Sequence, residues 1–168
     1  MTETAERMSV PAVDGFFTMS DEPQLIGGRL ESGGYCFPLH LGGGDPHRPD
    51  GAVETVLLSR RGRIWSFTNS AYPPPPPFII AEPYEPIVIA AVELEVEQMV
   101  ILGQVVPGWT VDDLSVGMEV QLELGILYTD DDVDYMTWQW CPLEVGSDSS
   151  GGPVHDRARL TESSPTHG

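Results

Sequence analysis

The side chains that could carry out nucleophilic or redox chemistry in this sequence are Cys36 and Cys141, together with two of the four histidines, His40 and His47. A catalytic thiolate or general base needs a neighbouring group that tunes and orients it. Each cysteine lies in an apolar stretch without an adjacent base, and the histidines flank a Gly-rich loop without an identifiable orienting partner. We interpret the cysteines as core thiols and the histidines as solvated loop residues.

Known catalytic and ion-binding motifs do not occur in this sequence. It contains no G-x-S-x-G, no H-E-x-x-H, no P-loop and no G-x-G-x-x-G with a downstream acid. The acidic stretch TDDDVD at 129–134 lacks the Gly and the terminal Glu of an EF-hand loop. We predict a solvated turn at this stretch and no catalytic residue in the chain.

Three of the eight arginines form a cluster, Arg60, Arg61 and Arg63, and no Lys or Arg follows between residues 64 and 156. An isolated guanidinium cluster can bind a phosphate group or a partner's carboxylates through paired hydrogen bonds. The alternative is a solvated hairpin turn. On the first reading, the three arginines are candidate contacts to a partner or to a phosphate-bearing ligand.

A run of five prolines at 73–77 predicts exposed polyproline II, because proline cannot donate a ladder hydrogen bond. One reading is a ligand for an SH3-like groove. The preferred one is a stiff loop against a permanent partner, since large apolar residues follow at once. We predict an interface that includes Phe78, Ile79, Ile80 and Trp109.

The composition excludes several classes of protein. The chain has 168 residues, no Lys, and a net charge of −18, which argues against binding to nucleic acid or to an anionic membrane. Two cysteines cannot form a disulfide framework or a four-Cys zinc site. With no leader sequence and no apolar run of about 20 residues, we expect a cytoplasmic protein.

The pattern of elements predicts an all-β fold. Residues 1–12 and 146–168 are polar tails that we expect to be disordered, and a Gly-rich loop at 42–51 separates a segment at 13–50 from a main domain at 51–145. One short helical turn is expected, with Thr110 and Asp113 as its capping pair and Gly117 as its end. Helical turn and strand order predict a small Greek-key barrel, the OB-fold, with a plain sandwich as the alternative. The strands are expected at 52–59, 63–71, 86–94, 99–106, 118–124 and 135–141.

Six stretches of this chain, in order and at similar spacing, resemble the thiolase-associated family known as domain of unknown function thirty-five. They are DGFFTM (14–19), LIGGRLESGGYCFP (25–38), SRRGRIWSFT (59–68), YPPPPPF (72–78), IAAVELE (89–95) and VDDLSVGMEVQLEL (111–124). The resemblance implies a short N-terminal helix, a rubredoxin-like zinc ribbon and a C-terminal OB-fold.

The chain departs from this family at the zinc ligands. The positions that correspond to its two Cys pairs are Arg29, Ser32, Gly43 and Pro46. We predict a degenerate ribbon without zinc, because a tetrahedral site needs four suitable ligands. The alternative is a site rebuilt from Cys36, His40, Asp45 and His47.

The resemblance implies a non-catalytic accessory subunit in a hetero-oligomer with a thiolase-like protein. The substrates of such a complex would be coenzyme A esters with fatty-acyl, aromatic-acyl or steroid side-chain groups, and no cofactor is expected on this chain. A stand-alone enzyme or small-ligand binder is the alternative. Single-stranded nucleic-acid binding is a third reading, which the lack of a positive groove opposes.

Overall fold

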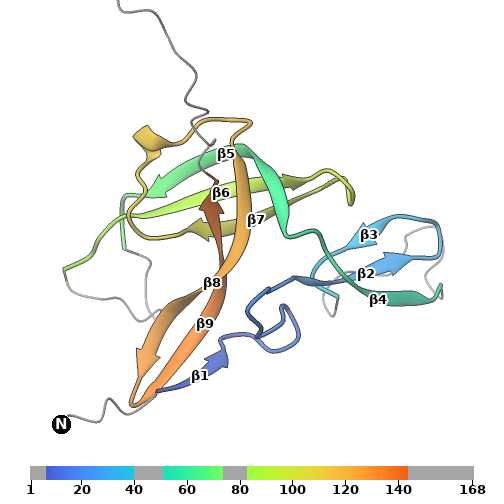
Figure 1. The fold of residues 1–168 in the computed structure, drawn as a ribbon, viewed down its shortest axis with the longest axis horizontal. Coiled ribbons are helices and arrows are strands. Elements are labelled where there is room, and N and C mark those ends of the chain that lie inside the picture. Colours follow the sequence, from blue (N-terminus) through green and yellow to red (C-terminus); the bar gives the residue numbers. More distant parts are fainter. Residues whose placement is uncertain (1–6, 40–50, 74–82, 144–168) are drawn as a thin grey trace, which may run out of the picture.

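The computed structural model describes residues 7–39, 51–73 and 83–143, and almost all of its regular structure is β (Figure 1). No α-helix occurs within these ranges, and no helix there is long and apolar enough to cross a bilayer. The elements are β1 (Met8–Pro11), β2 (Ile26–Leu30), β3 (Tyr35–Cys36), β4 (Val53–Leu57), β5 (Arg61–Ser70), β6 (Ile87–Leu94), β7 (Met99–Val105), the 3-10 helix η1 (Val111–Asp113), β8 (Glu119–Asp130) and β9 (Val133–Pro142).

Strands β5 to β9 close into a barrel. β5, β6 and β7 form an antiparallel meander, and β8 and β9 form a hairpin. The barrel closes because β5 pairs antiparallel with β8 while β7 pairs in parallel with β9. With η1 between β7 and β8, this topology is that of an OB-fold, which confirms the predicted fold class.

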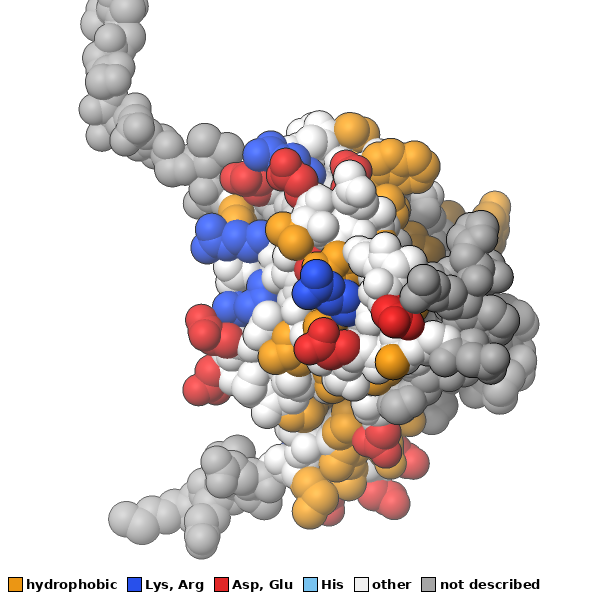
Figure 2. Space-filling view, turned by 90° about the vertical axis from the view of Figure 1, so that its right-hand side faces the viewer, with side chains coloured by type: hydrophobic (Ala, Val, Ile, Leu, Met, Phe, Trp, Pro, Cys, Tyr) orange, Lys and Arg blue, Asp and Glu red, His pale blue; other side chains and the backbone are white. Residues whose placement is uncertain are grey.

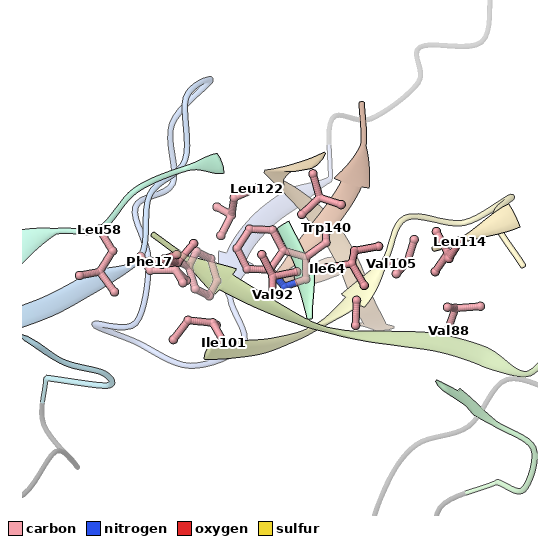
Figure 3. Close-up of a cluster of buried hydrophobic side chains, with 14 residues drawn as sticks. Phe17, Leu58, Ile64, Val88, Val92, Ile101, Val105, Leu114, Leu122 and Trp140 are labelled. Atoms are coloured by element: carbon pink, nitrogen blue, oxygen red, sulfur yellow. The ribbon is translucent and has the colours of Figure 1, made fainter. Parts of the chain in front are cut away.

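The core fills the barrel interior, as the alternating pattern of β8 predicted (Figure 3). Val120 and Leu122 are fully buried, whereas Glu119 and Glu123, the residues on either side of this stretch, are exposed. Trp140 on β9 is the largest fully buried side chain and lies at the centre of the cluster. Such a packed interior leaves the outer surface of the barrel as the place for any functional contact.

The first strand expected in the barrel pairs elsewhere. The stretch at 52–59 was expected to open the barrel, but β4 pairs antiparallel with β2 and completes a three-stranded sheet, ordered β3-β2-β4. The hairpin of β8 and β9 already closes the barrel, so that β4 is free to pair with β2. The change of sheet occurs at Leu58, which is fully buried and donates its N–H to Leu25 O at 2.9 Å.

The predicted short N-terminal helix and the predicted disordered tail at 1–12 are also incorrect where the structure describes them. Met8–Pro11 forms β1, which pairs in parallel with β9 because that edge of β9 would otherwise lack a partner. Residues 14–19 are not helical: a turn at Asp14 and Gly15, where Gly15 has a φ of 78°, is followed by an isolated antiparallel bridge between Phe17 and Leu25. The predicted C-terminal tail at 146–168 lies outside the described residues.

Aromatic side chains attach the N-terminal segment and its sheet to the barrel. Trp138 on β9 contacts three phenylalanines, Phe16, Phe17 and Phe37, at centroid distances of 6.3, 5.9 and 5.8 Å. Its Nε1 donates to Leu102 O at 3.0 Å. Trp138 thus links the N-terminal segment and its sheet to the barrel.

Candidate functional site

The three arginines predicted to contact a partner lie at the start of β5. Arg60 belongs to the link between the two sheets, and Arg61 and Arg63 belong to the strand. Arg60 is the first of them, and its side chain is 22% exposed. Its Nε donates to Pro23 O at 3.1 Å, and its Nη1 pairs with Glu22 Oε1 at 3.2 Å. Arg60 therefore holds the N-terminal segment against the barrel, which is a structural role within the chain itself.

Arg61 and Arg63 line a surface hollow of about 520 Å³ at the start of β5 and β8. The other side chains around it are Glu93, Glu95, Gln98 and Glu119. Arg63 Nη2 lies 3.2 Å from Glu119 Oε1, and both side chains are exposed, so the pair contributes little to stability. Arg61 Nε donates to a neutral acceptor, Gln121 Oε1, at 3.1 Å.

The charges around this hollow oppose the binding of a phosphate group. Its lining combines two guanidinium groups with three carboxylate side chains. Figure 2 likewise shows basic and acidic side chains interspersed along this protein surface rather than one basic face. The same three carboxylates would also repel a group of carboxylates on a partner, so the hollow itself favours neither reading of the arginine cluster. Arg61 is the arginine of the hollow whose hydrogen bond goes to a neutral side chain, that of Gln121.

Of the other predicted contacts, the structure describes only Trp109. It lies on the loop after β7, where it is half-buried and packs against the core. Phe78, Ile79 and Ile80 lie outside the described residues, so their contact with a partner stays a prediction.

The ribbon sheet does not offer a tetrahedral zinc site at its described positions. Arg29 and Ser32 are exposed, and no three His, Cys, Asp or Glu side chains of the described ranges converge. The partly buried thiol of Cys36 packs over Gly28 on the neighbouring strand, where a Cβ would meet its Sγ at 2.7 Å. These donors do not fit a structural zinc ion. His40, Asp45 and His47 lie outside the described residues.

Cys141 and Asp113 have shifted pKa values. Desolvation, the negative charge of Glu123 and a hydrogen bond with it raise the pKa of the Cys141 thiol, which disfavours a nucleophilic thiolate. The hydroxyl and N–H of Thr110 both donate to Asp113 Oδ2, at 2.7 and 2.9 Å, and lower the pKa of Asp113. The predicted end of the helical turn at Gly117 is wrong, because η1 already ends at Asp113 with Leu114 as its cap. Gly117, with a φ of 88°, belongs to the next turn, which leads into β8.

Sequence reasoning missed Glu97, the buried acidic side chain of the turn between β6 and β7. It is 8% exposed, and its Oε1 accepts hydrogen bonds from the N–H and the hydroxyl of Ser59 at 2.7 and 3.0 Å. Nothing in the turn sequence EVEQ signals this burial, because the partner lies 38 residues away. Glu97 fixes the link between the two sheets.

Neither cysteine is part of a nucleophile–base pair in the described ranges. The four histidines, at positions 40, 47, 155 and 167, all lie outside them. Cys141 Sγ lies 3.7 Å from the carbonyl oxygen of Pro142, and its other polar neighbour is the Glu123 carboxylate; burial and this carboxylate both raise the pKa of the thiol.

Comparisons with known proteins confirm the resemblance drawn from the sequence. Residues 55–124 match the family described as ChsH2, C-terminal OB-fold domain. A search of curated proteins finds no match. Among solved structures, the chain is similar to one titled "Ltp2-ChsH2(DUF35) aldolase", with a TM-score of 0.51 and 26% identity. The alignment covers 71% of this chain and 84% of that one.

Proposed function

We propose that this chain is the non-catalytic accessory subunit of a thiolase-like enzyme that acts on coenzyme A esters. The observation that carries the proposal is the similarity to a chain of the structure titled "Ltp2-ChsH2(DUF35) aldolase", of which the alignment covers 84%. The described residues support it, because they lack a nucleophile–base pair and leave apolar side chains exposed. A protein of this kind acts by stabilising or completing a partner's site.

In the proposed complex, the partner performs thiolysis or retro-aldol cleavage of a fatty-acyl, aromatic-acyl or steroid side-chain ester. This chain contributes contacts from Arg61, from Trp109 and from the loop with Phe78, Ile79 and Ile80. Arg61 pairs with a partner carboxylate, because its guanidinium is hydrogen-bonded to a neutral group of this chain, Gln121 Oε1. We propose a cytoplasmic hetero-oligomer whose accessory chain holds neither zinc nor a cofactor.

The test is co-expression with a thiolase-like protein of the source genome, chosen by gene neighbourhood. Size-exclusion chromatography and an assay of coenzyme A ester cleavage then compare the pair with each protein alone. We expect co-elution, and activity that requires both chains. If the two proteins elute separately and the partner is fully active alone, the proposed function is wrong.

Phe78 provides a matched test of the predicted contact loop. Buried aromatic anchors dominate interface energies, so Phe78→Ala is expected to weaken the complex by about 1–3 kcal/mol. The control is Tyr72→Ala, which removes an aromatic side chain that is 84% exposed just before the prolines. Equal affinity of the Phe78→Ala variant and the wild-type chain would remove Phe78 from the interface.

A further inference from the structure

The hairpin of β8 and β9 extends beyond the barrel as an arm. β5 pairs with β8 only as far as Gln121, and β7 pairs with β9 only from Gln139 onward. Between these points the two strands pair with each other, and β1 adds a third strand along β9. Figure 1 shows the three strands projecting together past the barrel. We define the arm as residues 8–13, 125–130 and 133–137.

The arm is rich in apolar side chains but has no core of its own. Asp134 is the one side chain of the arm that is buried. Figure 2 shows hydrophobic side chains near the lower end of the molecule, with acidic side chains beside them. The most exposed apolar side chains of the arm are Met8 at 67%, Ile126 at 52%, Val13 at 45% and Leu127 at 44%. An apolar surface of this kind, on a projecting element, is typical of a protein–protein interface.

Specific contacts keep the arm in shape without a core. Tyr128 and Tyr135 stack across its two strands with centroids 4.5 Å apart and planes at 15°. Thr129 Oγ1 donates to Asp134 Oδ1 at 2.7 Å, and Arg7 Nη1 lies 3.9 Å from the same oxygen. The surface is therefore preformed, which reduces the ordering entropy that binding would cost.

The charge at the tip of the arm selects the kind of partner. Asp130, Asp131 and Asp132 are exposed at the turn between β8 and β9. The chain has a net charge of −18 and no Lys, so a second copy would bring like charge to this tip. A partner surface with an apolar centre and a border of Lys or Arg fits the arm, because it covers the apolar side chains and attracts the aspartates.

We propose that the arm is the element by which this chain docks onto its thiolase-like partner, with Ile126 and Leu127 in contact and the three aspartates facing basic groups. This inference rests on the proposed function for the class of partner. It assigns the principal interface to the end of the β8–β9 hairpin, which neither the sequence nor the arginine cluster indicated.

The first experiment measures the affinity of the purified partner for the double variant Ile126→Thr/Leu127→Thr by calorimetry. Threonine keeps the strand propensity while it removes the apolar contact. We expect the Kd to rise about tenfold or more, with circular dichroism and the melting temperature of the isolated chain unchanged. The matched control is Val116→Thr, because Val116 is 70% exposed on the loop before β8 and lies outside the arm.

The second experiment neutralises the tip with Asp130→Asn, Asp131→Asn and Asp132→Asn. Asparagine tolerates the positive φ of 49° at position 131, so the turn is kept. We expect association to slow severalfold at low salt and the difference to shrink at high salt.

Each result decides between the two proposals. If the wild-type chain binds the partner and the arm variants bind equally well, the arm is not the interface, while the proposed function stands. If the wild-type chain does not bind the partner at all, both proposals are wrong. If the isolated wild-type chain sediments as a dimer and the Ile126→Thr/Leu127→Thr variant as a monomer, the arm docks a second copy, and our choice of partner is refuted.

Discussion

Replacing Glu97 by alanine should destabilise the protein by loosening the link between its two sheets. Glu97 lies on the turn between β6 and β7, and Ser59 lies between β4 of the ribbon sheet and β5 of the barrel. The 8% exposed carboxylate accepts two hydrogen bonds from Ser59 through one oxygen. The Glu97→Ala variant loses both bonds and leaves the Ser59 N–H without its acceptor.

The expected cost follows from these contacts. A hydrogen bond to a charged group contributes about 1.5–3 kcal/mol. The two bonds share one carboxylate oxygen, and the other, Oε2, is buried without a hydrogen-bond partner, which costs desolvation that alanine would relieve. We therefore expect Glu97→Ala to lower the free energy of unfolding by about 2–4 kcal/mol, a large fraction of the stability of an ordinary domain.

The assay is urea unfolding of the purified chain, followed by tryptophan fluorescence. Glu97→Gln is the matched control, because its amide oxygen can accept both bonds from Ser59 and its amide nitrogen replaces the unpaired oxygen. It should cost less than about 1 kcal/mol, since the neutral group is also cheaper to bury. An alanine variant as stable as the wild-type chain, or a glutamine variant as unstable as the alanine one, would refute this account of the link.

Further predictions concern the arginines, the thiol, the cap and the metal. Arg61→Ala should weaken the complex with the partner or raise the KM for the coenzyme A ester without changing the melting temperature, and an unchanged complex with unchanged kinetics would count against a contact. Because its pKa is raised above the ordinary value of 9.0, Cys141 should react slowly with iodoacetamide at neutral pH, and a site-resolved alkylation rate that saturates below pH 9 would contradict this. The pKa of Asp113 is lowered from 3.8, so its stabilising effect is present above this pH and is lost on further acidification, and the gap in melting temperature between the wild-type chain and Asp113→Asn should close below about pH 4. Elemental analysis of protein purified without chelators should find no zinc, and one equivalent would show that the ribbon was rebuilt as a metal site.

The sequence alone determined the type of fold and its resemblance to a family. Alternation along β8 placed Val120 and Leu122 inside, because side chains on a strand point to opposite faces in turn. The capping pair of Thr110 and Asp113 located the one helical turn of the described residues, since this signal is local, whereas the turn ends at Asp113 rather than at Gly117. Motifs at ordered spacing indicated the family without any knowledge of long-range contacts.

Long-range pairing, by contrast, was decided only by the tertiary structure. A strand pattern specifies which face is apolar but not which edge it pairs with, so β4 was assigned to the barrel although it pairs with β2. The residues of β1 show no strand pattern of their own, because β1 is held in extended form by pairing with β9, more than 120 residues away. The burial of Glu97 and the exposed arm likewise depend on which distant segments meet. Local sequence signals thus predicted the strands and the helical turn, whereas the pairing of strands that are distant in the sequence decided the position of β4, the burial of Glu97 and the exposure of the arm.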